Sequence, residues 1–205
     1  MKKLIFLLIS ACLMVGMPSC KKAMKNVLNE ISSSTGMDGS KTFDNAETLN
    51  SVKEMLLSKC DTEKMPIYRI FITEVDECSG RAQFVNVSML NADKTQTFYQ
   101  NFYFNGEAMP VNDNSDSADA TPIDLSALDM NIIAKGIENA KALIPEGYSY
   151  KALRMLDLGN GKTRLTIALT KDGEETVTSA GQTSEVYYDA IYEIDNKTGE
   201  ATDKN

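Results

Sequence analysis

The side chains best suited to chemistry in this chain are carboxylates, and their densest group lies in residues 112–119. This stretch, Asn-Asp-Asn-Ser-Asp-Ser-Ala-Asp, alternates oxygen-bearing side chains as calcium-binding loops do. It lacks the central glycine of such a loop, and Ile123 stands where the bidentate glutamate belongs. The pattern therefore favours a solvated acidic linker, and we expect no metal site and no cofactor.

Histidine and tryptophan are absent from all 205 residues. The lack of histidine excludes Ser-His-Asp and Cys-His catalysis, histidine-ligated zinc and histidine-based acid–base chemistry. A carboxylate pair for glycoside cleavage could be drawn from the 29 acidic residues, but nothing in the sequence assembles an aromatic platform beside such a pair. We therefore expect a protein that is not an enzyme.

Cys20 is the cysteine with the clearest chemical assignment. It follows two lysines and an apolar run over residues 4–16, which suits a signal peptide and is too short to span a bilayer comfortably. The residues Met17-Pro18-Ser19-Cys20 resemble the looser recognition box of Bacteroidetes-type lipoproteins, which implies cleavage before Cys20 and acylation of its sulfur. The alternative is ordinary secretion with an unmodified cysteine.

Lipidation would place the mature chain in the cell envelope, outside the cytoplasm, with the membrane as one partner. Residues 1–19 would be removed, and residues 20–43 would form the lipidated cysteine and a polar tether. Each buried methylene contributes about 0.8 kcal/mol, so several acyl chains, palmitate among them, anchor a protein stably. Lys21 and Lys22 follow the cysteine without an aspartate, which by analogy with proteobacterial sorting favours the outer membrane.

The charge of the mature chain argues against nucleic acid as a partner. Loss of two lysines with residues 1–19 changes the formal net charge from −8 to −10. The basic residues cluster only at Lys21, Lys22 and Lys25. Because such a surface repels phosphates, we expect no nucleic-acid binding.

The sequence contains candidate residues for two further covalent modifications, a disulfide and O-glycosylation. Cys60 and Cys78 lie in a compartment that permits disulfides, but we expect them at the end of a helix and at the far end of the next strand. A strand of about ten residues rises about 3.3 Å per residue, which would separate the cysteines beyond bridging distance. Ser117, in Asp116-Ser117-Ala118, resembles a short acceptor sequence for O-glycosylation in Bacteroidetes envelope proteins; the alternative is an unmodified linker.

Hydrophobic spacing predicts a helix over residues 45–60, with Asp44 and Glu47 as its capping pair, and a second helix from Ser126 and Asp129 to residue 143. Each helix precedes three strand-like runs, at 67–76, 81–90 and 97–105 and then at 150–158, 163–170 and 185–195. We therefore predict an α+β fold of two α-β-β-β units, residues 44–110 and 125–205, joined by an acidic linker over 111–124. In each unit a helix would pack on an antiparallel meander sheet.

The C-terminal residues 192–200, Tyr-Glu-Ile-Asp-Asn-Lys-Thr-Gly-Glu, combine an aromatic, alternating strand with a glycine turn. They resemble the end of the PepSY-type domain, a small helix-plus-meander module. The resemblance covers residues 126–205, whereas residues 44–110 match only in the order of their elements. The resemblance implies non-catalytic binding of a protein or peptide partner, such as a secreted peptidase that is inhibited or chaperoned. The family has no catalytic residue that could be mapped onto this sequence.

Aromatic and aliphatic side chains lie on both faces of two expected strands, although a sheet covered by one helix needs only one apolar face. The surplus residues are Phe71, Val75, Tyr99 and Tyr103, which we take as candidates for a partner-binding face. The alternative is that they pack between the two units or under a long loop.

Two other functions stay open at this point. One is a carrier or sensor of a small apolar ligand, held between helix and sheet by Leu128, Ile137, Leu165 and Ile167. The other is a structural component of the envelope. An ordinary filled core would argue against the carrier, whereas an exposed, contiguous aromatic face would argue for the binding protein.

Overall fold

The computed structural model describes residues 42–104, 106–114, 120–179 and 181–205. The predicted signal peptide, Cys20, most of the tether and Ser117 lie outside the described residues, so the expectations for them stay predictions.

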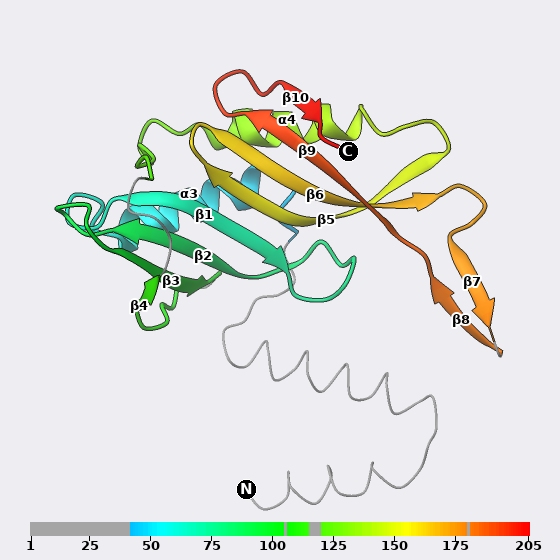
Figure 1. Cartoon of the computed structure of the whole chain (residues 1–205), viewed down its shortest axis with the longest axis horizontal. Coiled ribbons are helices and arrows are strands. Elements are labelled where there is room, and N and C mark those ends of the chain that lie inside the picture. The colour runs from blue at the N-terminus through cyan, green and yellow to red at the C-terminus, as the bar shows by residue number, and fades with distance from the viewer. Residues whose placement is uncertain (1–41, 105, 115–119, 180) are drawn as a thin grey trace, which may run out of the picture.

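One antiparallel sheet of eight strands runs the length of the molecule, in the order β10-β9-β6-β5-β1-β2-β3-β4 (Figure 1). Together with two helices it confirms the α+β class. The strands of this sheet are β1 (Ile67–Glu74), β2 (Ala82–Leu90), β3 (Thr97–Tyr103), β4 (Asn112–Asn114), β5 (Tyr148–Gly159), β6 (Lys162–Lys171), β9 (Tyr188–Asp195) and β10 (Ala201–Asp203).

The two predicted meanders do not form separate sheets. The first strand of one, β1, pairs antiparallel with the first strand of the other, β5, from Arg69 opposite Gly159 to Thr73 opposite Met155. An unpaired edge strand exposes a row of backbone N–H and C=O groups, and this pairing satisfies both rows. The expected units are therefore continuous in one sheet.

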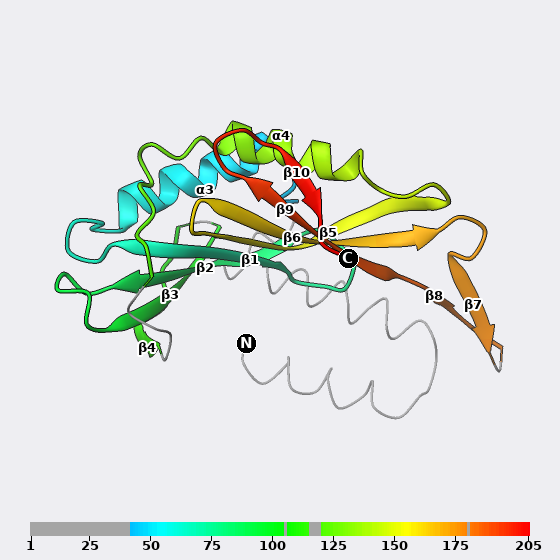
Figure 2. The same cartoon turned by 45° about the horizontal axis from the view of Figure 1, so that its top comes forward.

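Both helices lie on the same face of the sheet (Figure 2). They are α3 (Ala46–Lys59) and α4 (Met130–Lys141), and no helix in the described ranges is long and apolar enough to cross a membrane. The predicted cap of α3 was wrong by one residue, because Asn45 caps it by accepting a 2.9 Å hydrogen bond from the Thr48 N–H. The second helix begins later than expected: Asp129 caps it, and Ser126 lies in a turn held by Asp124.

The hydrophobic core fills the layer between the helices and the sheet. Both halves of the sheet contribute side chains without solvent exposure, as do both helices. Gly136 of α4 faces Ile194 of β9 so closely that a Cβ at this position would clash with the isoleucine side chain. The clean alternation predicted for β6 is confirmed, since Leu165, Ile167 and Leu169 are all buried on the helix side.

Four short strands were not predicted, because their sequences are largely polar: β10, which pairs with β9 at one edge of the sheet, and three others. β4 lies within the predicted linker, and a hairpin of β7 (Thr176–Ser179) and β8 (Gln182–Glu185) projects beyond the end of the main sheet (Figures 1 and 2). The strand predicted over residues 185–195 begins later than expected. It is β9, which starts at Tyr188, whereas Glu185 is the last residue of β8. Every described residue of the hairpin strands is exposed, so no apolar periodicity marks them.

Candidate binding surface

The sheet face opposite the helices, here called the open face, carries three of the four predicted candidates. Residues paired directly across neighbouring strands point to the same side of a sheet. Phe71 is paired with Asn86 and with Asp157, and Asn86 is paired with Asn101, so these four side chains form one row across β5, β1, β2 and β3. Further along the sheet, Arg164 and Glu193 continue the row.

Charged groups hold Phe71 in place on the open face. The Arg69 guanidinium lies 5.1 Å from the centre of the Phe71 ring. Arg69 also donates two hydrogen bonds, of 2.7 and 2.8 Å, to the two carboxylate oxygens of Asp157 on β5. This bidentate geometry fixes the plane of the guanidinium across the β1–β5 junction. The guanidinium is therefore held over the Phe71 ring.

Tyr99 and Tyr103 lie on β3, on the same face and on either side of Asn101. Tyr99 is opposite Ser88 and Tyr103 is opposite Phe84. The row between them is polar, since the Asn86 side-chain amide donates a 2.7 Å hydrogen bond to Asn101. The tyrosines and Phe71 therefore share one face but are separated by polar side chains, rather than forming the contiguous aromatic patch that we expected.

Val75 stands apart from the other three candidates. It follows the last residue of β1, its backbone N–H donates to the Arg81 carbonyl, and its side chain is 39% exposed. It lies at the end of the sheet rather than within a row of the open face.

Sequence reasoning missed several apolar members of the open face. A second row joins Thr73 of β1, Met155 of β5, Thr166 of β6 and Ile191 of β9. Phe84, which is paired with Tyr103, adds a fourth aromatic ring to the face. The signal for Phe84 was available, because it alternates with the core residues Val85 and Val87. Met155 and Ile191 belong to the face only through pairings that the sequence does not display.

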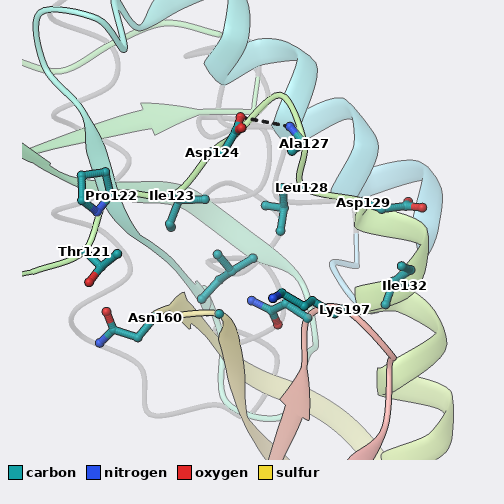
Figure 3. Close-up of a pocket in the computed structure, with 13 residues that line it drawn as sticks. Thr121, Pro122, Ile123, Asp124, Ala127, Leu128, Asp129, Ile132, Asn160 and Lys197 are labelled. Atoms are coloured by element: carbon teal, nitrogen blue, oxygen red, sulfur yellow. Dashed lines mark hydrogen bonds between the residues drawn. The ribbon is translucent and has the colours of Figure 1, made fainter.

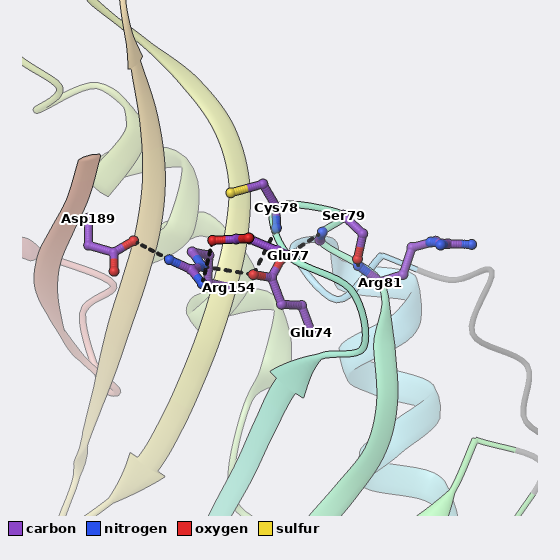
Figure 4. Close-up of polar contacts among 8 residues, drawn as sticks. Glu74, Glu77, Cys78, Ser79, Arg81, Arg154 and Asp189 are labelled. Carbon is purple, nitrogen blue, oxygen red and sulfur yellow. Dashed lines mark hydrogen bonds and ion pairs between the residues drawn. The ribbon is translucent and has the colours of Figure 1, made fainter. Parts of the chain in front are cut away.

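An ion-pair cluster centred on Arg154 closes one end of the open face (Figure 4). Arg154 sits at a bulge of β5, where the strand re-aims its side chain. It donates hydrogen bonds of 2.7 Å to Glu74 and 2.8 Å to Asp189, which together raise its pKa. Glu74, with a side chain only 8% exposed, also accepts from the backbone N–H groups of Cys78 and Gly80. The cluster ties β1, the following loop, β5 and β9 together.

Cys78 packs beside this cluster against Ala152 and Ala168. Burial raises the pKa of the Cys78 thiol and also that of the Cys60 thiol, the latter to about 11. Both cysteines are free. Each is protonated at neutral pH, and neither has the lowered pKa of a catalytic nucleophile.

Asp44 links the start of the described fold to its second half. Burial raises the pKa of this carboxyl, but a 2.7 Å hydrogen bond from Tyr150, the positive charge of Lys141 and a 3.2 Å hydrogen bond from Lys141 all lower it, and the net shift is downward. This contribution to stability is therefore complete above the ordinary pKa of aspartate and is lost as the pH falls through the lowered value. The residue expected to cap α3 instead joins α4 to β5.

A pocket of about 400 Å³ lies away from the open face, where the chain enters α4 (Figure 3). Residues 121–132 form one wall, and the β5–β6 turn and the β9–β10 turn form the others. Of the four residues expected to line a ligand cavity, only Leu128 borders this pocket. Ile137, Leu165 and Ile167 have no solvent exposure and belong to the packed core.

The first part of the acidic stretch forms a strand rather than a calcium-binding loop. Asn112, Asp113 and Asn114 form β4, paired with β3, and residues 115–119 lie outside the described residues. Within the described part of the chain, no group of three or more Cys, Asp or Glu side chains is arranged to hold a metal ion.

Comparison with known proteins leaves the family open: the chain matches no family model, no curated protein and no solved structure.

Proposed function

We propose that this protein is a lipid-anchored envelope protein that binds a protein or peptide partner through the open face of its sheet, without catalysis. The observation that carries the proposal is the composition of that face. Half-buried Phe71, Tyr99 and Tyr103 supply contact area, and the fixed Arg69–Asp157 pair supplies directional polar groups. Aromatic and arginine side chains contribute most of the binding energy in protein interfaces.

A second part of the proposal is that the chain consists of two PepSY-like α-β-β-β units. Support comes from the order of elements, because α3 precedes β1, β2 and β3 just as α4 precedes β5, β6 and β9. Support also comes from the junction, since each series enters the sheet through its first strand. Joined in this way, two small units present one long face, which suits an extended protein partner such as a peptidase.

The absence of histidine supports binding rather than catalysis, as does the character of the buried polar groups. The buried carboxylate of Glu74 is fully engaged with Arg154 and two backbone N–H groups. Tyr150 hydrogen-bonds Asp44, and burial raises the pKa of its hydroxyl, so it is protonated at neutral pH. These groups stabilise the fold, and burial raises the pKa of the neighbouring Cys78 thiol, which is therefore protonated at neutral pH.

We expect partner binding to depend on the open face more than on exposed tyrosines elsewhere. The double variant Tyr99→Ser, Tyr103→Ser should bind the partner at least about tenfold more weakly, because two large interface side chains are truncated. The test is affinity capture from envelope and secreted fractions with the full chain in detergent, followed by titration of the captured partner.

The matched control for this experiment is Tyr188→Ser. Tyr188 is 39% exposed but is paired with Leu169, whose side chain faces the helices, so it does not belong to the open face. The control should bind as the unmodified protein does, and all variants should have the same circular dichroism spectrum. Equal binding by the double variant would show that the open face is not the interface.

Lipidation gives an independent test of the envelope location. In cells fed a fatty acid with a clickable alkyne group, the unmodified chain should incorporate the label and Cys20→Ala should not, because the acyl chains are attached through that sulfur. The measurement is in-gel fluorescence after coupling a dye to the alkyne. Cys60→Ala serves as the control and should be labelled normally. Equal labelling of Cys20→Ala would overturn the assignment of the anchor.

A further inference from the structure

The pocket in Figure 3 has an apolar wall and a polar end. Ile123, Leu128, Ile132 and Leu158 contribute aliphatic side chains to its lining. In Figure 3, Ile123 and Leu128 lie between Asp124 on one side and Lys197 on the other. A volume of about 400 Å³ falls within the range of small-ligand sites. The space and its aliphatic wall suit a short apolar group.

The polar end contains a side-chain amide whose nitrogen has no hydrogen-bond partner among the described residues, although the residue as a whole is buried. Asn196 is 9% exposed and lines the pocket, and its Oδ1 accepts a 2.7 Å hydrogen bond from the buried Thr163 hydroxyl. Among the described residues, nothing accepts a hydrogen bond from its Nδ2. Because Thr163 fixes the amide, the free N–H groups are held ready for an acceptor that enters the pocket.

Lys197 supplies positive charge next to this donor. Its side chain lines the pocket and, in the described part of the chain, forms no ion pair. The nearby Asp124 carboxylate is already engaged, because its Oδ1 accepts from the Ser126 hydroxyl and from two backbone N–H groups. The Asp195 carboxylate also lies nearby: its pKa is lowered by hydrogen bonds from the Lys197 and Thr198 backbone N–H groups and, to a smaller extent, by the charge of Lys197. One ammonium beside such acids suits a single negative charge better than a phosphate dianion.

We propose that this pocket binds a monocarboxylate with a short aliphatic body, with its carboxylate on Asn196 Nδ2 and Lys197 Nζ and its alkyl group against Ile123 and Leu128. The ligand is either a free branched-chain acid or the C-terminal residue of a peptide, since both present the same chemistry. The site is separate from the open face, so it stands or falls independently of the proposed partner interface.

The test is an NMR titration of the ¹⁵N-labelled full chain in detergent, read at the Asn196 side-chain amide. The probes are isocaproate for a free acid and N-acetyl-leucine for a peptide C-terminus, with N-acetyl-leucinamide and inorganic phosphate as controls. We expect saturable shifts with one or both carboxylates and none with the controls. The tighter of the two carboxylates identifies the source.

Variants locate the interaction. Lys197→Met should weaken carboxylate binding about tenfold, and Asn196→Asp should abolish it by replacing the donor with a like charge. Lys135→Met, which changes an exposed lysine of α4 outside the pocket, should bind normally. Should N-acetyl-leucinamide or phosphate bind as well as the carboxylates, should neither carboxylate shift Asn196, or should Lys197→Met match Lys135→Met, the proposal is wrong.

Discussion

Arg154→Met is expected to lower the free energy of unfolding by about 3 kcal/mol, the effect of breaking a buried ion pair by removing one partner. Glu74 would keep its hydrogen bonds from the backbone N–H groups of Cys78 (2.9 Å) and Gly80 (3.2 Å), but its buried charge would lose its counterion. Methionine preserves much of the aliphatic stem, so the loss reports on charge rather than packing. The measurement is urea denaturation at neutral pH followed by far-UV circular dichroism.

Arg81→Met provides the matched control. Arg81 is exposed to about the same extent as Arg154, at 28% against 27%, but it pairs with the half-exposed Asp76. Exposed pairs contribute about 0–1 kcal/mol, so this variant should lose little stability. The double variant Arg154→Met, Glu74→Gln should recover part of the loss, because it removes the buried charge. If Arg154→Met were no more destabilising than Arg81→Met, the cluster would be a surface feature.

The sequence predicted the elements of the fold better than their assembly. Alternation in residues 163–170 gave the core-facing side of β6 correctly, because Leu165, Ile167 and Leu169 face the helices; on the other side the sequence did not reveal that Ala168 is also buried, against Cys78 and Ala152. The pairing of β1 with β5 joins residues more than eighty positions apart, and no local pattern encodes it. Capping chemistry was also ambiguous, since aspartate and asparagine are equally good caps and Asp44 directly precedes Asn45.

The candidate surface was predictable only in part, for a related reason. The sequence identified Phe71, Tyr99 and Tyr103 because, along their own strands, they point to the side opposite the core residues. Their separation by Asn86 and Asn101 depends on the register between strands, which the sequence does not show. The pocket could not be predicted from the sequence. The composition of residues 195–199 indicates a turn, but the hydrogen bond between Asn196 and Thr163 joins residues on different strands and turns, and no local pattern reveals it.

Gly136→Ala is expected to destabilise the protein by about 2 kcal/mol, although alanine is the better helix former by about 1 kcal/mol. A Cβ at this position would lie 2.4 Å from Ile194 Cγ2 and 2.9 Å from Ile194 Cδ1, far inside normal contact. Overpacking a core by one methyl group usually costs about 1–3 kcal/mol. Asn139 holds α4 in place, since it donates a 2.8 Å hydrogen bond to the Gly199 carbonyl, so the helix cannot simply move outward.

A double-mutant cycle with Ile194→Ala separates this clash from any other effect of the glycine. Ile194→Ala alone should cost about 2–5 kcal/mol, because it leaves a cavity under α4. In that background the new methyl group enters the cavity, so Gly136→Ala should be neutral or stabilising by up to about 1 kcal/mol. Measured by urea denaturation, the coupling between the two sites should reach about 2–3 kcal/mol, near the upper end for residues in contact. Equal destabilisation by Gly136→Ala in both backgrounds would mean that close packing of α4 on β9 is not what requires the glycine.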